Sequence, residues 1–113
     1  MREILITIED FDRVDMRVGT VIRAQVNEKA RVPAYCLWID FGSELGVLQS
    51  SAQLTALYTP QTLVGRRVIA VVNLPPRRVA GFSSQVLVLG TDSPAGTALL
   101  APGDEAQNGD RVF

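Results

Sequence analysis

The chain alternates apolar and polar residues along Tyr35-Cys36-Leu37-Trp38-Ile39-Asp40-Phe41, and Gly42 follows directly. Successive side chains of a β-strand point to opposite faces, so the odd-numbered residues of this stretch are predicted to face a core. The even-numbered residues would then share the opposite face. A short alternating run closed by glycine indicates a half-buried strand in a β-rich fold.

The segments on both sides continue this β pattern. Residues 17–26 also alternate, with the even-numbered positions predicted to share one face, and Gly19 is expected to supply a bend or bulge. A short strand is predicted at residues 46–49, and β-branched runs predict two more at residues 67–72 and 86–89. Between those last two strands lies a proline-stiffened, turn-rich connector, residues 73–81.

The period changes to a helical one after the third strand. Residues 50–53, Ser-Ser-Ala-Gln, fit a capping box with Ser50 as the N-cap. Leucine and tyrosine side chains follow at helical spacing as far as Tyr58, and Pro60 is expected to end this short helix.

Three strands, one helix and two further strands are the element order of the OB-fold, a five-stranded barrel. We therefore predict an all-β OB-fold barrel that occupies residues 1–113 as a single domain. A helical turn at residues 9–14, with Phe11 and Val14 on its buried side, is expected as an N-terminal extension. The tail after Gly90 is expected to add a strand around residues 98–100 and an extended arm.

Composition argues against catalysis. The chain has no histidine, which removes the usual general base near neutral pH and the commonest zinc ligand. It also lacks the calcium-loop, phosphate-loop and nucleophile-elbow motifs. We therefore expect no metal, no cofactor and no enzymatic activity.

The single cysteine and the apolar content bear on compartment and assembly. Cys36 cannot form an intrachain disulfide, and a free thiol fits a reducing compartment. The apolar run at residues 4–8 is too short for a signal sequence, and no stretch reaches the length of a membrane span. We expect a cytoplasmic protein without membrane insertion. With 47% hydrophobic residues, some apolar surface is expected to lie in a subunit interface.

The net charge of −1 conceals a segregation of charge. Residues 45–91 contain no acidic residue but four arginines, Arg66, Arg67, Arg77 and Arg78, whereas the segments on either side are net negative. Gathered on one patch, these guanidinium groups would give one face a positive potential. The alternative is that they only keep turns soluble.

Several residues are candidates for binding, and each has a structural alternative. The hydroxyl groups of residues 50–53 at a helix start suit a phosphate, although ordinary capping also accounts for them. Arg77 and Arg78 suit phosphates or bases, or else a solvated turn. Lys29 and Arg31 lie in the loop that OB-folds use beside an oligonucleotide, but the same loop is ordinarily polar.

Two residues of the central strand admit a structural interpretation. Trp38 suits a stacking platform for a base, but packing is favoured because large aromatic side chains are usually mostly buried. Cys36 has no basic neighbour in sequence that would activate its thiol, so we interpret it as structural.

Five stretches together resemble the CsaA-type proteins: Lys29–Ala34, Leu37–Gly42, Ser50–Gln53, Ala70–Phe82 and Val86–Gly90. That family is similar to the tRNA-binding OB domains attached to some methionyl- and phenylalanyl-tRNA synthetases. The resemblance implies a homodimer that binds tRNA through shape and backbone contacts. It also implies a second function, that of an export-related chaperone that holds unfolded preproteins or peptides.

Carried over by position, the resemblance implies an RNA-binding surface made of Arg31, Ser50, Ser51, Gln53, Asn73, Arg77, Arg78 and Ser84. The dimer contacts would come from the N-terminal segment and from the tail after Gly90. The chain departs from the family pattern at Cys36, where lysine is common, at Leu74, where phenylalanine is common, and around residues 83–85. The missing lysines weaken the expected electrostatic attraction to RNA, while the missing glutamate at residue 85 leaves the segment free of acid.

Overall fold

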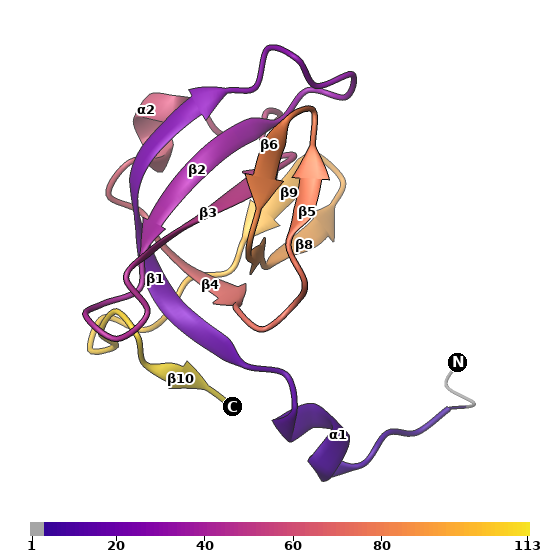
Figure 1. Ribbon diagram of the computed structural model, residues 1–113, viewed down its shortest axis with the longest axis vertical. Coiled ribbons are helices and arrows are strands. Elements are labelled where there is room, and N and C mark those ends of the chain that lie inside the picture. The colour runs from indigo at the N-terminus through magenta and orange to yellow at the C-terminus, as the bar shows by residue number, and fades with distance from the viewer. Residues whose placement is uncertain (1–3) are drawn as a thin grey trace.

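The computed structural model describes residues 4–113, and the centre of the fold is one strongly curled antiparallel sheet (Figure 1). Its strands are β1 (Met16–Val26), β2 (Tyr35–Asp40), β3 (Val47–Ala52), β4 (Arg67–Val71), β7 (Leu87–Val88) and β10 (Arg111–Val112). They run in the order β3-β2-β1-β4-β7, and β10 pairs with β1. The sheet closes into a nearly complete five-stranded barrel, which confirms the predicted OB-type fold.

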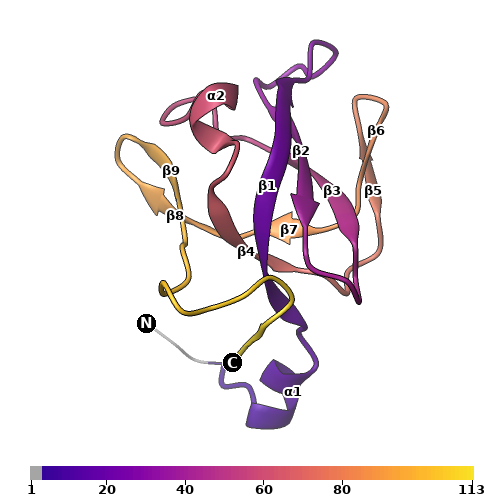
Figure 2. The same cartoon turned by 90° about the vertical axis from the view of Figure 1, so that its left-hand side faces the viewer.

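Two hairpins and two short helices complete the described part of the chain. The hairpins are β5 (Arg77–Val79) with β6 (Phe82–Ser84), and β8 (Gly90–Ser93) with β9 (Gly96–Leu99), where the tail strand was predicted. Helix α1 (Ile8–Asp12) precedes β1, and α2 (Pro60–Leu63) connects β3 to β4. None of the helices within residues 4–113 is long and apolar enough to cross a bilayer. Figure 2 shows α2 and the β5–β6 hairpin on opposite sides of the barrel.

The odd-numbered side chains of β2 lie at the centre of the core, as predicted. Leu37 and Ile39 are fully buried, Tyr35 is nearly so, and Phe41, which directly follows the strand, is also fully buried. Other elements supply the remaining members of the core cluster, Val21, Leu54, Leu63, Val68, Ala70 and Val86. Because Leu63 belongs to α2, this helix is anchored to the barrel by its buried face.

Strand β1 departs from the predicted alternation because it contains a bulge. Its register with β2 shifts between Val21 and Arg23, so the side chains change phase at that point. Val21 therefore faces the core ahead of the bulge, whereas Ile22, predicted to share a face with Val18, is 49% exposed. Beyond the bulge the predicted even-numbered phase holds, because Ala24 packs against the core, and Val26 is exposed at the end of the strand. The bulge predicted at Gly19 thus lies a few residues further along the strand.

Gly19 has a different role, which is to leave room for β2. A Cβ atom at this position would lie 2.6 Å from Cγ2 of Ile39 and 2.8 Å from the ring of Phe41. Both of those side chains are fully buried and cannot move aside without disturbing the core.

The helix predicted from Ser50 is wrong. Ser50 belongs to β3, where it pairs with Leu37 and is buried. The residues that resemble a capping box instead lie at the end of a strand, with Ser50 to Ala52 inside β3 and Gln53 directly after it. The apolar spacing that follows produces only one turn, in which the amide of Tyr58 donates to the carbonyl of Leu54 at 3.1 Å.

Helix α2 begins where the predicted helix was expected to end. Pro60 is its first residue, and Thr59 is its N-cap. Proline suits this position because the first turn of a helix leaves its N–H groups unpaired, so the missing donor costs nothing. Pro60 therefore starts a helix.

Residues 73–81, predicted as a connector, contain half of a hairpin. Ala80 and Gly81 form its turn with φ values of 49° and 83°, the left-handed conformation that a tight hairpin turn requires. The strand predicted at residues 86–89 is the shorter β7. The amides of Gln85 and Val86 donate to the carbonyl of Gln49 instead of continuing a ladder with β4.

Helix α1 confirms the predicted N-terminal turn, although it begins earlier. Thr7 caps it by accepting a hydrogen bond from the amide of Asp10 at 3.1 Å. Phe11 is partly buried, but Val14, predicted to lie on the same buried side, is exposed.

We predict that Gly19→Ala lowers the free energy of unfolding by about 1–3 kcal/mol, because the new methyl group overpacks the contact with Ile39 and Phe41. Gly103→Ala is the matched control, since its Cβ would meet no atom within 4 Å. Urea denaturation of both variants measures the difference. Equal stability of the two variants would contradict the proposed close approach of β1 and β2.

Candidate nucleic-acid interface

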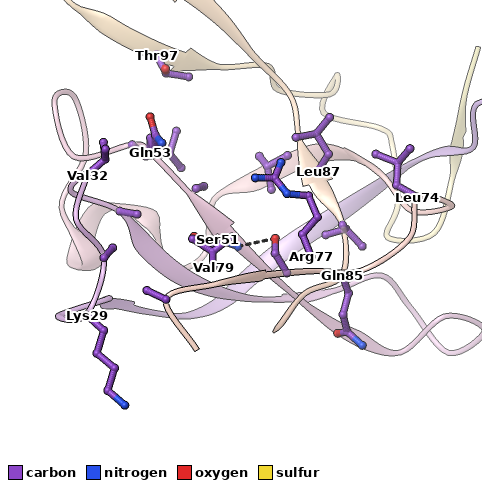
Figure 3. Close-up of a pocket in the computed structure, with 18 of the residues that line it drawn as sticks. Lys29, Val32, Ser51, Gln53, Leu74, Arg77, Val79, Gln85, Leu87 and Thr97 are labelled. Atoms are coloured by element: carbon purple, nitrogen blue, oxygen red, sulfur yellow. Dashed lines mark hydrogen bonds between the residues drawn. The ribbon is translucent and has the colours of Figure 1, made fainter. Parts of the chain in front are cut away.

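A pocket of about 620 Å³ opens beside the β5–β6 hairpin (Figure 3). Residues 29–34 of the β1–β2 loop line one part of it, and residues 51–54 at the end of β3 line another. The rest is supplied by residues 74–75, the hairpin, residues 85–88 and Thr97 of β9. Segments far apart in the sequence therefore converge on one concave site, as is usual for ligand pockets.

Hydrogen bonds along the outer edge of β3 hold the hairpin in place. The amide of Gln49 donates to Oε1 of Gln85 at 3.0 Å, and its Nε2 donates to the carbonyl of Ser83 at 2.8 Å. Two residues further on, the amide of Ser51 donates to Oγ of Ser84 at 2.9 Å. The free edge of β3 is thereby satisfied, and the hairpin forms a fixed wall of the pocket.

The charged side chains that line the pocket are all basic: Lys29, Arg31 and Arg77. Figure 3 shows the Arg77 side chain reaching from β5 into the pocket, whereas Lys29 extends away from it. Within residues 4–113, the ion pairs involve only Arg13 and Arg17, so neither Arg31 nor Arg77 is neutralised by a carboxylate of that region. The pocket consequently favours an anionic ligand.

Five of the eight residues predicted to bind RNA line this pocket: Arg31, Ser51, Gln53, Arg77 and Ser84. Arg78 follows Arg77 on β5 and therefore points to the opposite face of the hairpin, where its guanidinium donates to the carbonyl of Gly81 at 2.9 Å. It is exposed beside the pocket without lining it.

The other two predicted residues have structural partners. Ser50 is only 1% exposed, and its hydroxyl donates to the carbonyl of Val86 at 2.9 Å. Asn73 accepts a hydrogen bond from the amide of Asp15 at 2.9 Å and donates to the carbonyl of Arg13 at 2.7 Å. Ser50 ties β3 to the start of β7, and Asn73 ties the exit of β4 to the segment between α1 and β1.

The four arginines do not form the single patch expected from the sequence. Arg66 follows α2 and lies over the ring of Tyr58, 4.9 Å from its centroid. Arg67 donates to backbone carbonyl groups of the C-terminal tail, including that of Ala106. Both lie at the start of β4, next to α2, which is across the barrel from the hairpin that carries Arg77 (Figure 2). The two arginine pairs are close in sequence but far apart in the fold, because β4, which separates them, runs the length of the barrel.

Trp38 packs against its neighbours, in agreement with the favoured interpretation. Its ring meets that of Phe82 edge to face at a centroid distance of 5.5 Å, and the guanidinium of Arg23 lies 4.6 Å from its centroid. Cys36 is buried, and that burial raises the pKa of its thiol. A less acidic, inaccessible thiol fits the structural role predicted for it.

The apolar residues of the pocket were not predicted. Leu74, Val79 and Leu87 line it together with Val32 and Thr97. Leu87 had an available signal, because it alternates with the buried Val86 and had to face outward in a strand. Thr97 had none, since only the tertiary fold brings β9 to this pocket.

A curled antiparallel barrel with a basic pocket beside its first loop is an OB-type ligand-binding domain. A family model described as "Putative tRNA binding domain" matches residues 16–111. The chain therefore belongs to this tRNA-binding domain family.

Solved structures and curated relatives agree with this assignment. The chain is 50% identical to the chaperone CsaA of Bacillus anthracis, with a TM-score of 0.90 over 97% of this chain and 100% of that one. It is 41% identical to the CsaA chaperone protein of Picrophilus torridus, with a TM-score of 0.91 over 96% of this chain and 100% of that one. The resemblance to CsaA-type proteins is thus confirmed.

Methionine–tRNA ligases are similar to the chain over a small part of their own length. The enzyme of Pyrococcus abyssi is 33% identical over 111 residues, and that of Methanobrevibacter smithii is 39% identical over 108 residues. These alignments cover 98% and 96% of this chain but only 15% and 16% of the ligases. The similarity is therefore to one segment of each ligase.

Proposed function

We propose that this chain is a non-catalytic, dimeric, cytoplasmic tRNA-binding protein that recognises RNA through backbone and shape contacts. One observation supports the proposal most strongly. The chain belongs to a tRNA-binding family, and its pocket is lined by Arg31 and Arg77 but by no carboxylate. The absence of histidine from the sequence supports a binding role over a catalytic one.

The arrangement of charge suits a folded RNA more than a base sequence. Arg77 inside the pocket, Arg78 on the other face of the same strand and Arg31 on the facing loop surround the hairpin with guanidinium groups. Such groups bind phosphates in a fixed fork geometry and carry no sequence information themselves. Recognition would therefore depend on how phosphates are arranged in space, as in a structured tRNA.

We predict that Arg77→Glu weakens tRNA binding at least tenfold at low salt and flattens its salt dependence, because each phosphate contact contributes to counterion release. Arg66→Glu is the matched control. It makes the same charge change on the far side of the barrel and should leave affinity nearly unchanged. Filter-binding titrations with tRNA at two salt concentrations measure both effects.

Two results would refute the tRNA-binding proposal. One is wild-type affinity that is absent or insensitive to salt. The other is an equal loss of affinity in the two charge-reversal variants, because only the net charge would then matter and the pocket would not.

The proposed dimer uses the N-terminal arm, residues 4–8, and the C-terminal end. Ile4, Leu5, Ile6 and Ile8 are between 65% and 85% exposed, and Phe113 is almost fully exposed. Large apolar side chains gathered on one arm are stabilised when a partner covers them. Helix α1 and β10 lie at the same end of the molecule (Figures 1 and 2), and Arg111 donates to the carbonyl of Asp12 at 2.7 Å. A two-fold axis near this end would leave both pockets open.

We predict that the double variant Leu5→Asp, Ile6→Asp sediments as a monomer at concentrations where the wild type is a dimer, because two buried carboxylates would oppose the interface. Val64→Asp is the control, since it alters an equally apolar but distant exposed residue beside α2. Sedimentation equilibrium gives the masses. A monomeric wild type, or a double variant that remains dimeric, would contradict this interface.

Two observations favour the alternative, a chaperone that binds unfolded preproteins or peptides during export. Leu74, Val79 and Leu87 give the pocket apolar walls that would also suit apolar side chains of a peptide, and two similar structures are named as chaperones. Aggregation of an unfolded protein separates the two functions. Suppression by both wild type and Arg77→Glu, combined with no affinity for tRNA, would favour the chaperone.

A further inference from the structure

The pocket combines aliphatic walls with polar groups that have no partner in the described structure. Figure 3 shows Val32 on one side and Leu74 and Leu87 on the other, with Ser51 and Val79 between them. Leu87 and Val32 are about half exposed, so these walls face open space and are not packed into the core.

The polar groups are available to a ligand. Among the hydrogen bonds within residues 4–113, none uses the side-chain amide of Gln53 or the guanidinium of Arg77. The hydroxyl of Ser84 accepts from the amide of Ser51 and keeps its own O–H to donate. The pocket therefore offers an amide, a hydroxyl and a cation around an aliphatic slot.

Size and charge restrict what this slot accepts. Its volume of about 620 Å³ lies within the range of pockets that enclose one small ligand. The lack of any carboxylate in its lining disfavours cationic ligands. A flat, partly apolar group with polar edges and an attached anion would satisfy the walls, the amide and the guanidinium together.

We propose that the pocket holds one unpaired nucleotide of the bound RNA, with its base between the aliphatic walls and its phosphate at Arg77. Gln53 is positioned to bond the edge of the base, as amide side chains do with adenine. A base in a duplex is stacked between its neighbours and cannot enter, whereas a bulged or loop nucleotide can. This inference rests on the proposed RNA-binding function and adds to it a preference for RNA that exposes a single base.

The test compares two hairpin RNAs of the same length and charge, one fully paired and one with a single bulged adenosine. Because a good bidentate contact between an amide side chain and a base edge contributes roughly five- to hundredfold in affinity, the bulged RNA is expected to bind the wild type at least fivefold more tightly. Leu87→Trp should remove this preference by filling the slot. Val47→Trp places the same ring on an exposed residue outside the pocket and should retain the preference. Fluorescence anisotropy with end-labelled RNAs gives the affinities.

Gln53→Ala provides a second variant that leaves the slot empty. Gln53 is exposed, so its loss should not affect folding, and it should reduce discrimination between bulged adenosine and bulged uridine. If Leu87→Trp fails to fold in a urea melt, this variant still decides the question. Undiminished discrimination in Gln53→Ala would then overturn the proposed base contact.

The possible outcomes distinguish failure of the nucleotide pocket from failure of the proposed tRNA binding. Salt-dependent binding of both hairpins with equal affinity would overturn the nucleotide pocket and leave tRNA binding intact. Absence of binding to tRNA and to both hairpins would overturn both. If an apolar, end-blocked pentapeptide binds wild type but not Leu87→Trp, and the bulge gives no preference, the slot is a peptide site and the proposal is wrong.

Discussion

The structure depends on how the outer edge of β3 is satisfied. Strand β3 ends the sheet, and its exposed backbone groups bond to residues 83–86, which fold back against it. Gln49 makes most of this contact, because its amide, carbonyl and side chain all bond to that segment. The same bonds close the barrel and shorten β7. They also fix the β5–β6 hairpin in place as a wall of the pocket. Without them, Arg77 would sit on a free loop and the pocket would lose one side.

This constraint determines which arginines can act together. The hairpin places Arg77 in the same pocket as Arg31 of the β1–β2 loop, a residue 46 positions earlier in the printed sequence. Arg66 and Arg67 are closer to Arg77 in sequence, but Arg66 stacks on Tyr58 and Arg67 bonds to the C-terminal tail. The positive surface is therefore smaller than the acid-free segment suggests. It combines basic residues from one loop and one hairpin around a concave site, an arrangement that suits an irregular feature of a folded RNA.

Much of the barrel could be predicted from the sequence, because alternating apolar and polar residues indicate which face of a strand is buried. The odd-numbered residues of β2 are buried as their pattern indicates. The prediction was wrong where a local pattern matched two structures: Ser50 and Gln53 fit a helix cap, but Ser50 pairs with β2, and the strand continues to Ala52, just before Gln53. Gly19 predicted a bulge, but this glycine instead allows the close approach of Ile39 and Phe41, and the bulge lies between Val21 and Arg23. Five site residues meet in the pocket, whereas the role of Asn73 and the contribution of Thr97 depend on tertiary contacts that no local pattern contains.

The central claim is that RNA binds at the face formed by the β1–β2 loop, the end of β3 and the β5–β6 hairpin. Amide hydrogen exchange of the full chain, with and without saturating tRNA, tests this claim most directly because it needs no substitution. The account predicts that tRNA slows exchange in residues 29–34, 51–54 and 74–88 and leaves residues 60–67 unaffected. Protection confined to residues 60–67 and the C-terminal tail, with none in the hairpin, would contradict it.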